Sequence, residues 1–152
     1  MNKTFYHIAF LMFLTVGRMA YADGAYPIVE PSAASMEISK LLADAKPDEA
    51  TAALEKDLPP MPSTQFNFEQ LKTGFKLLSQ NGPADVVDEV LSKKYGDSVH
   101  VIIHYVHFPR QEPPVNQFVF LRYTFMKGKE GWMMTTFDFK TSGLFPPPGW
   151  GD

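Results

Sequence analysis

Three histidines stand close together in the sequence, at His100, His104 and His107. Neutral imidazole is a common metal ligand, so this grouping first suggests a metal site. The stretch 99–108 around them is rich in β-branched and aromatic residues and predicts a strand. On a strand, His100 and His104 share a face but lie about 13 Å apart, and His107 points the other way. We therefore expect no metal and no cofactor here.

A histidine can also work with a carboxylate as an acid/base pair. Asp138 is the carboxylate that neighbouring strands could bring to His104, and Tyr123 or Arg122 would complete the pocket. These four residues are the catalytic candidates. The sequence has no Gly-x-Ser-x-Gly elbow, no phosphate-binding glycine loop and no cysteine for thiol chemistry. A solvated or hydrogen-bonded histidine is the simpler interpretation, so we favour a protein that is not an enzyme.

Two more strands are predicted, over 117–126 and 132–140, with a short glycine turn between them. Side chains alternate between the faces of a strand, and each of the three strands has one nearly apolar face and one mixed face. We expect the apolar faces, including that of Val101 and Ile103, to pack against helices. The mixed faces would then carry the candidate ligand-binding residues, which are His100, His104, Arg122, Thr124, Trp132, Thr136 and Asp138.

The register of the last two strands decides whether these polar residues meet. If Phe125 pairs with Met133, Arg122 lies opposite Thr136 and diagonal to Asp138, where an ion pair can form. A slip of one residue would place Arg122 and Asp138 on opposite faces. The consistency of the apolar faces favours the first register.

Helices are predicted before the strands. One begins at the N-cap Asn67 and runs to Leu78, and a second follows Asn81-Gly82-Pro83 and ends near Tyr95. Upstream, residues 23–62 form an extended segment and a short helical arm that packs on the domain or binds a partner. The expected fold of residues 63–142 is α+β, with helices packed on a curved antiparallel β-meander of three or more strands.

The spacing Phe68-x2-Leu71-x2-Gly74-x3-Leu78, followed by Arg122-Tyr123-Thr124-Phe125 and Trp132-x4-Phe137-x-Phe139, resembles the nuclear-transport-factor-2-like (NTF2-like) superfamily over about residues 66–141. The resemblance implies a cone-shaped α+β domain with helices in the hollow of a curved sheet. It implies no single activity, because that superfamily includes enzymes, ligand carriers, dimerisation modules and secretion-machine subunits. The strand-like segment 26–29 could supply a further strand.

Both ends of the sequence have distinctive patterns. Lys3, the apolar run 8–16 and the small residues Ala20 and Ala22 predict a signal peptide over 1–22, cleaved between Ala22 and Asp23. The run is too short to span a bilayer, and without cysteine no lipoprotein anchor can form. We expect a bacterial periplasmic or secreted protein. Three interpretations are open for the Pro- and aromatic-rich tail 143–152: it packs on the sheet edge, serves as a docking peptide, or is an exposed terminus.

The composition is globular, with 45% hydrophobic residues and a net charge of −3, which argues against binding nucleic acid. The leading hypothesis is an exported non-enzymatic module that binds another envelope protein or an apolar small molecule. The alternatives are a small acid/base enzyme of isomerase or hydrolase type with a sheet-lined pocket, and an inhibitor or immunity-type protein. Homodimerisation stays open.

Overall fold

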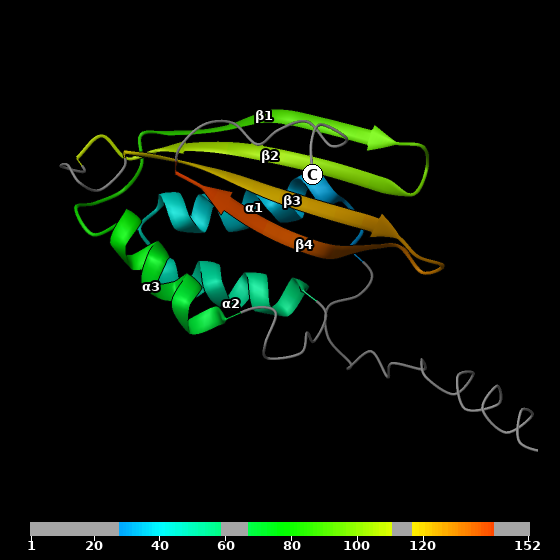
Figure 1. Ribbon diagram of the computed structural model, residues 1–152, viewed down its shortest axis with the longest axis horizontal. Helices are drawn as coiled ribbons and strands as arrows, with labels where there is room; N and C mark the ends of the chain where they lie inside the picture. The colour runs from blue at the N-terminus through cyan, green and yellow to red at the C-terminus, as the bar shows by residue number, and fades with distance from the viewer. Residues whose placement is uncertain (1–27, 59–66, 111–116, 142–152) are drawn as a thin grey trace, which may run out of the picture.

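Three helices precede a four-stranded antiparallel sheet in the computed structural model, which describes residues 28–58, 67–110 and 117–141. The helices are α1 (Pro31–Ala43), α2 (Pro47–Asp57) and α3 (Phe68–Leu78). The strands, in spatial as in chain order, are β1 (Val86–Tyr95), β2 (Val99–His107), β3 (Phe118–Lys127) and β4 (Trp132–Lys140). All three helices lie on one side of the sheet (Figure 1). The predicted α+β class is confirmed. The predicted signal peptide, its cleavage position and the tail from residue 143 lie outside the described residues.

The helices begin where the sequence supplies caps and prolines. The side chain of Asn67 accepts a hydrogen bond from the Gln70 amide at 3.0 Å, so the predicted cap of α3 is confirmed. Pro31 and Pro47 occupy the first turns of α1 and α2, where a missing N–H costs nothing. The predicted arm is part of the core, because Leu42 of α1 and other apolar residues of these two helices are fully buried.

The helix predicted between Pro83 and Tyr95 is wrong, because this segment is the edge strand β1. Its register against β2 shifts between Glu89 and Leu91, which leaves Val90 as an extra residue that is 50% exposed. A bulge breaks the strict alternation of a strand, and the apolar residues then recur at a spacing that imitates a helix. The β-branched valines are compatible with the strand.

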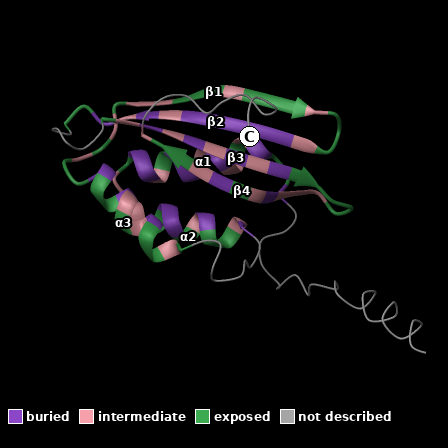
Figure 2. Cartoon of the chain, viewed as in Figure 1, coloured by how far each residue is buried: buried purple, intermediate pink, exposed green. Residues whose placement is uncertain are grey.

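The helices cover the opposite face of β2 from the one predicted. Ile102 and Val106 belong to the main core, and His100 and His104 are buried on that same face, which we call the covered face. On β3 the predicted apolar face does enter the core, since Tyr123 pairs with Ile102. The other side of the sheet, with Val101 and Ile103, is the outer face. Figure 2 shows that burial concentrates on the central strands β2 and β3.

The pairing of β3 with β4 changes register along its length, and no part of it has the predicted register. Phe125 pairs with Met134 near the turn, which is one residue away from the predicted register. A bulge next to Thr124 then shifts the pairing again, so Arg122 lies directly opposite Asp138. The predicted register is therefore wrong, but the predicted ion pair is confirmed, with Arg122 Nη2 2.6 Å from Asp138 Oδ2.

Before α1, Ile28 adds one antiparallel bridge to the start of β4. Its amide donates to the Trp132 carbonyl at 2.9 Å and its carbonyl accepts from the Trp132 amide at 3.2 Å. The segment 26–29 is the one that the sequence offers as a possible further strand. Of this segment, residues 26 and 27 lie outside the described part, and Ile28 forms an isolated bridge rather than a strand.

Candidate functional site

The predicted ligand-binding residues divide between the two faces of the sheet. His100, His104 and Trp132 lie on the covered face, where Trp132 packs against the core. The remaining members are on the outer face, namely Arg122, Thr124, Thr136 and Asp138. The predicted acid/base pair of His104 and Asp138 is therefore separated by the sheet itself. The structure groups Tyr123, but not Arg122, with His104.

His104 is the centre of a buried polar network between β2, β3 and α1. Its Nδ1 lies 2.6 Å from the Ser39 hydroxyl, which in turn lies 2.9 Å from the Tyr123 hydroxyl. Its Nε2 lies 3.4 Å from the Ser35 hydroxyl. The tilted rings of His104 and Tyr123 pack with centroids 5.5 Å apart. We call these four residues the serine–histidine network.

One arrangement of protons satisfies the whole network. Ser35 donates its single hydroxyl proton to the Ser32 carbonyl at 3.2 Å, so towards His104 it can only accept. His104 then carries its proton on Nε2 and presents Nδ1 as an acceptor. Ser39 donates to Nδ1 and accepts from the Tyr123 hydroxyl. The imidazole is thus neutral, with its N–H on the side nearer Glu89, whose Oε2 lies 3.8 Å from Nε2.

The electrostatics of the network favour its neutral form. Burial lowers the pKa of His104 to about 4, although the nearby Glu89 carboxylate opposes that shift. Burial raises the pKa of Tyr123, with the hydrogen bond to Ser39 acting in the opposite direction. Both side chains therefore stay in their neutral protonation state near neutral pH.

Ser39, His104 and Glu89 together resemble the serine, histidine and carboxylate of a nucleophilic triad. The burial of Ser39 and His104 excludes nucleophilic catalysis in this conformation. Ser39, His104 and Tyr123 are each 0% exposed, and their hydroxyl and imidazole groups bond to one another. A substrate carbonyl cannot approach the Ser39 hydroxyl while α1 lies on the sheet. The network instead ties α1 to β2 and β3. The sequence signal for it, two serines four residues apart on one face of α1, was missed.

The other two histidines have separate partners. On the covered face, His100 Nε2 lies 2.8 Å from the Ser92 hydroxyl, while its Nδ1 is buried without a hydrogen bond. Burial, and secondarily the charge of Lys94, lowers the pKa of His100. On the other side of β2, His107 Nδ1 lies 2.7 Å from Asp85 Oδ1. Among the described residues no three His, Asp or Glu side chains form a metal-sized cluster.

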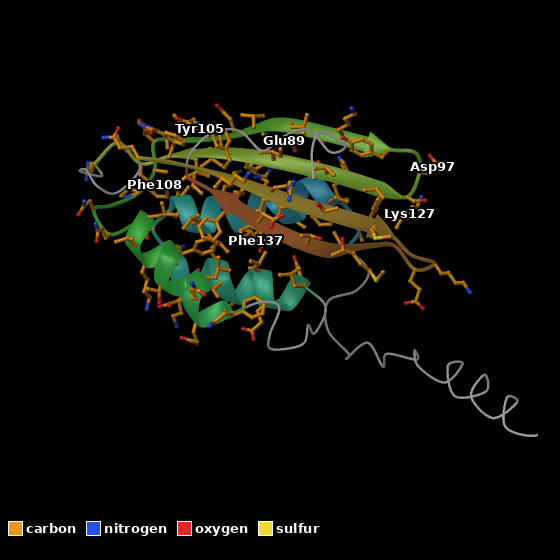
Figure 3. All side chains as sticks on the ribbon, in the orientation of Figure 1. Glu89, Asp97, Tyr105, Phe108, Lys127 and Phe137 are labelled. Atoms are coloured by element: carbon orange, nitrogen blue, oxygen red, sulfur yellow. The ribbon has the colours of Figure 1, made fainter. Side chains whose placement is uncertain are left out.

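The outer face carries a group of neighbouring aromatic rings. Tyr105 lies with its ring centroid 5.3 Å from that of Phe120 and 6.2 Å from that of Phe118, and its ring stacks on His107. All of these side chains are partly exposed. We call Tyr105, Phe118 and Phe120 the aromatic row. Figure 3 places Tyr105 near the end of the sheet where Phe108 lies, opposite the end with Asp97 and Lys127.

A polar pair lies next to the aromatic row. Arg122 donates to Asp138 Oδ2 through Nη2 at 2.6 Å and through Nε at 3.1 Å. Both side chains are partly exposed, and Thr124 and Thr136 are paired beside them. The pair joins β3 to the edge strand β4, so the outer face combines aromatic side chains with an arginine at one side. Aromatic residues and arginine are both enriched at protein interfaces.

A scan against protein-family models and a search of curated proteins both found no match to this chain. None of the helices in the described ranges is long and apolar enough to cross a membrane.

Proposed function

We propose that this chain is an exported, non-enzymatic binding module that contacts another envelope protein through the outer face of its sheet. The observation that carries the proposal is the contrast in access between the two faces. The serine–histidine network is sealed under α1, whereas the aromatic row and the Arg122–Asp138 pair reach solvent. Aromatic and arginine side chains supply much of the binding energy at protein interfaces.

A protein partner is better supported than an apolar small molecule. Between the sheet and the helices, where a cone-shaped fold could hold a ligand, Phe75, Tyr123 and Phe125 are fully buried side chains of the core. A broad sheet face with an ion pair beside its aromatic side chains suits a complementary protein surface. The NTF2-like resemblance, which we retain as a proposal, agrees with a binding role without specifying the partner.

The proposal of export rests on the first 22 residues, whose basic start, apolar run and small residues before Asp23 match a signal peptide. The mature protein would then begin at Asp23 in the periplasm or outside the cell. N-terminal sequencing of the protein recovered from the envelope fraction tests this step. A first residue other than Asp23, or recovery only from the cytoplasm, would contradict it.

Site-specific photo-crosslinking tests the binding face. A photoreactive residue is placed at Thr136, which is exposed on the outer face, and as a matched control at Leu77, which is exposed on α3. We expect one discrete protein adduct from position 136 and none from position 77. The adduct should decrease strongly when Phe118 and Phe120 are both changed to serine. Adducts of equal yield from both positions, or none from position 136, would overturn the proposal.

A further inference from the structure

Strand β1 (Val86–Tyr95) forms one border of the sheet (Figure 1), and among the described residues it pairs with β2 alone. We call the side of this strand that faces away from β2 the β1 edge. Along such an edge, backbone N–H and C=O groups are available to a further strand. The opposite border, β4, already receives the isolated bridge from Ile28. The β1 edge is therefore the place where the sheet can be extended by a whole strand.

The charged side chains of β1 are divided by sign along the strand. Asp88 and Glu89 lie in its first half, Lys93 and Lys94 lie in its second half, and all four are exposed. Neither Asp88 nor Lys94 forms an ion pair with another described residue. In an antiparallel copy of this strand the acidic half meets the basic half, whereas a parallel copy would place carboxylates beside carboxylates. The strand is thus complementary to itself in the antiparallel direction.

The bulge at Val90 gives the strand the symmetry that such pairing needs. Two residues an odd number of positions apart normally point to opposite faces of a strand. Across the bulge, however, Asp88 and Lys93 both pair with residues on the outer face of β2. Glu89 and Ser92 both pair with residues on its covered face. Bulges and lysines usually keep an edge strand from pairing, but here they match the two halves of the strand in both face and charge.

We propose that two copies of this chain associate through the β1 edge, antiparallel about a two-fold axis that passes between Val90 and Leu91. Asp88 of each copy then lies opposite Lys93 of the other on the outer face, so the interface contains this ion pair twice. Val90, which is 50% exposed in the single chain, lies beside the axis and becomes covered. A contact that uses the same patch of both copies closes on itself, so it produces a dimer and not a fibre.

The covered side of this arrangement has room for the helices. Helix α1 lies under β2, where Ser39 bonds to His104. Three strand spacings separate β2 from β2 of the second copy, or about 14 Å at about 4.8 Å each. Packed helices need only about 8–10 Å between their axes. On the same side, Glu89 lies opposite Ser92 of the second copy and diagonal to its Lys94, within reach of a further ion pair.

Sedimentation equilibrium of the purified protein tests the association. We expect a reversible monomer–dimer equilibrium that Asp88→Lys and Lys93→Asp each weaken about tenfold or more, because each change places like charges opposite each other twice. An equimolar mixture of the two variants should associate as strongly as the wild type, because every lysine then faces an aspartate. The control Glu130→Lys, an exposed position in the turn between β3 and β4, should leave the equilibrium unchanged.

Three results would overturn the inference while circular dichroism shows folded chains. They are a wild type that stays monomeric even at about 1 mM, a dimer that Asp88→Lys does not weaken, and a mixture of variants that does not associate. A second measurement uses Val90→Cys, since the natural sequence has no cysteine. Mild oxidation should link two copies at position 90 but not in the control Leu77→Cys, and equal yields would contradict the two-fold axis. The purified chain suffices for both measurements, so their outcome is independent of the proposed outer-face partner.

Discussion

The two faces of the sheet treat their polar residues in opposite ways. On the covered face, His104 and Tyr123 are sealed from water and bond to serines of α1. On the outer face, Arg122 and Asp138 bond to each other and remain partly exposed. A buried polar group needs a hydrogen-bond partner inside the fold, so the polar groups of the covered face bond to one another and stabilise the fold. The outer face keeps polar groups that a partner can reach.

This difference shows why residue type alone is a poor guide to a site. Histidine is the residue type in this sequence best suited to acid/base chemistry or metal binding. His104, which lies under α1, instead forms hydrogen bonds that hold the helix on the sheet. The plain aromatic residues of the outer face are better placed for binding. The predictions below test this division of roles, since substitutions on the covered face should affect stability far more than those on the outer face.

The largest effect is expected for His104→Ala. The change removes a fully buried ring and leaves the Ser39 hydroxyl without the acceptor that it has in the network. We expect a loss of about 3–5 kcal/mol in the free energy of unfolding, from the cavity and the unsatisfied hydroxyl together. Urea denaturation monitored by circular dichroism measures it.

The matched control is His107→Ala on the same strand. His107 is partly exposed and pairs with an exposed carboxylate, so its loss should cost less than about 1 kcal/mol. If the two substitutions lowered the free energy of unfolding equally, the serine–histidine network would contribute no more to stability than the His107–Asp85 pair. The proposed difference between the two faces would then be wrong.

The second effect is a dependence of stability on pH that originates from His104. Its pKa is about 4 in the folded protein and 6.5 as the ordinary value. Between these values the unfolded chain binds more protons than the folded one, so stability falls as pH falls from 6.5 to 4 and is fully present above 6.5. The total contribution is about 3 kcal/mol.

Urea denaturation of the wild type and of His104→Gln across this pH range isolates the contribution of His104 to the pH dependence of stability. The other titrating groups are common to both proteins. Asp57, whose pKa is raised by burial, changes stability in the opposite sense and cancels in the difference. The glutamine variant should show the flatter profile. Parallel profiles would show that His104 is not held neutral by the fold.

Helix caps and regular strand alternation could be predicted from the sequence, and the β-bulges could not. The capped start of α3 at Asn67 and the alternation of β3 were predicted because each depends on local chemistry. Strand β1 was mistaken for a helix because the bulge at Val90 disturbs its alternation. A bulge depends on the pairing of two strands, and one strand's sequence does not reveal it.

The candidate site could be predicted only in part for a related reason. The Arg122–Asp138 pair was expected and is present, although it needed a bulge that was not foreseen. The side of the sheet that the helices cover was predicted wrongly on β2, since Val101 and Ile103 looked more apolar than the face with His104. The serines of α1 that satisfy His104 are more than 60 residues away in sequence, and a pattern within one element does not connect them.

A moderate effect is expected for Tyr123→Phe, which removes one hydroxyl and keeps the buried ring. Ser39 can still donate a hydrogen bond to His104, but it loses the one that it accepts from the Tyr123 hydroxyl at 2.9 Å. We expect a loss of about 1–2 kcal/mol in the free energy of unfolding, without a cavity term. Urea denaturation measures it, and combination with Ser39→Ala in a double-mutant cycle should show strong non-additivity. Fully additive losses would contradict the shared network.

The smallest effect on stability is expected for Asp138→Asn on the outer face. The Arg122–Asp138 pair is partly exposed, so water compensates for much of its loss, and we expect less than about 1 kcal/mol in urea denaturation. Its effect on crosslinking from Thr136 should be larger in proportion, because charged side chains on a binding face contribute to the selection of the partner. A stability loss as large as that of Tyr123→Phe, with crosslinking unchanged, would reverse the comparison. The outer pair would then hold the fold together, and the two faces would no longer differ in their roles.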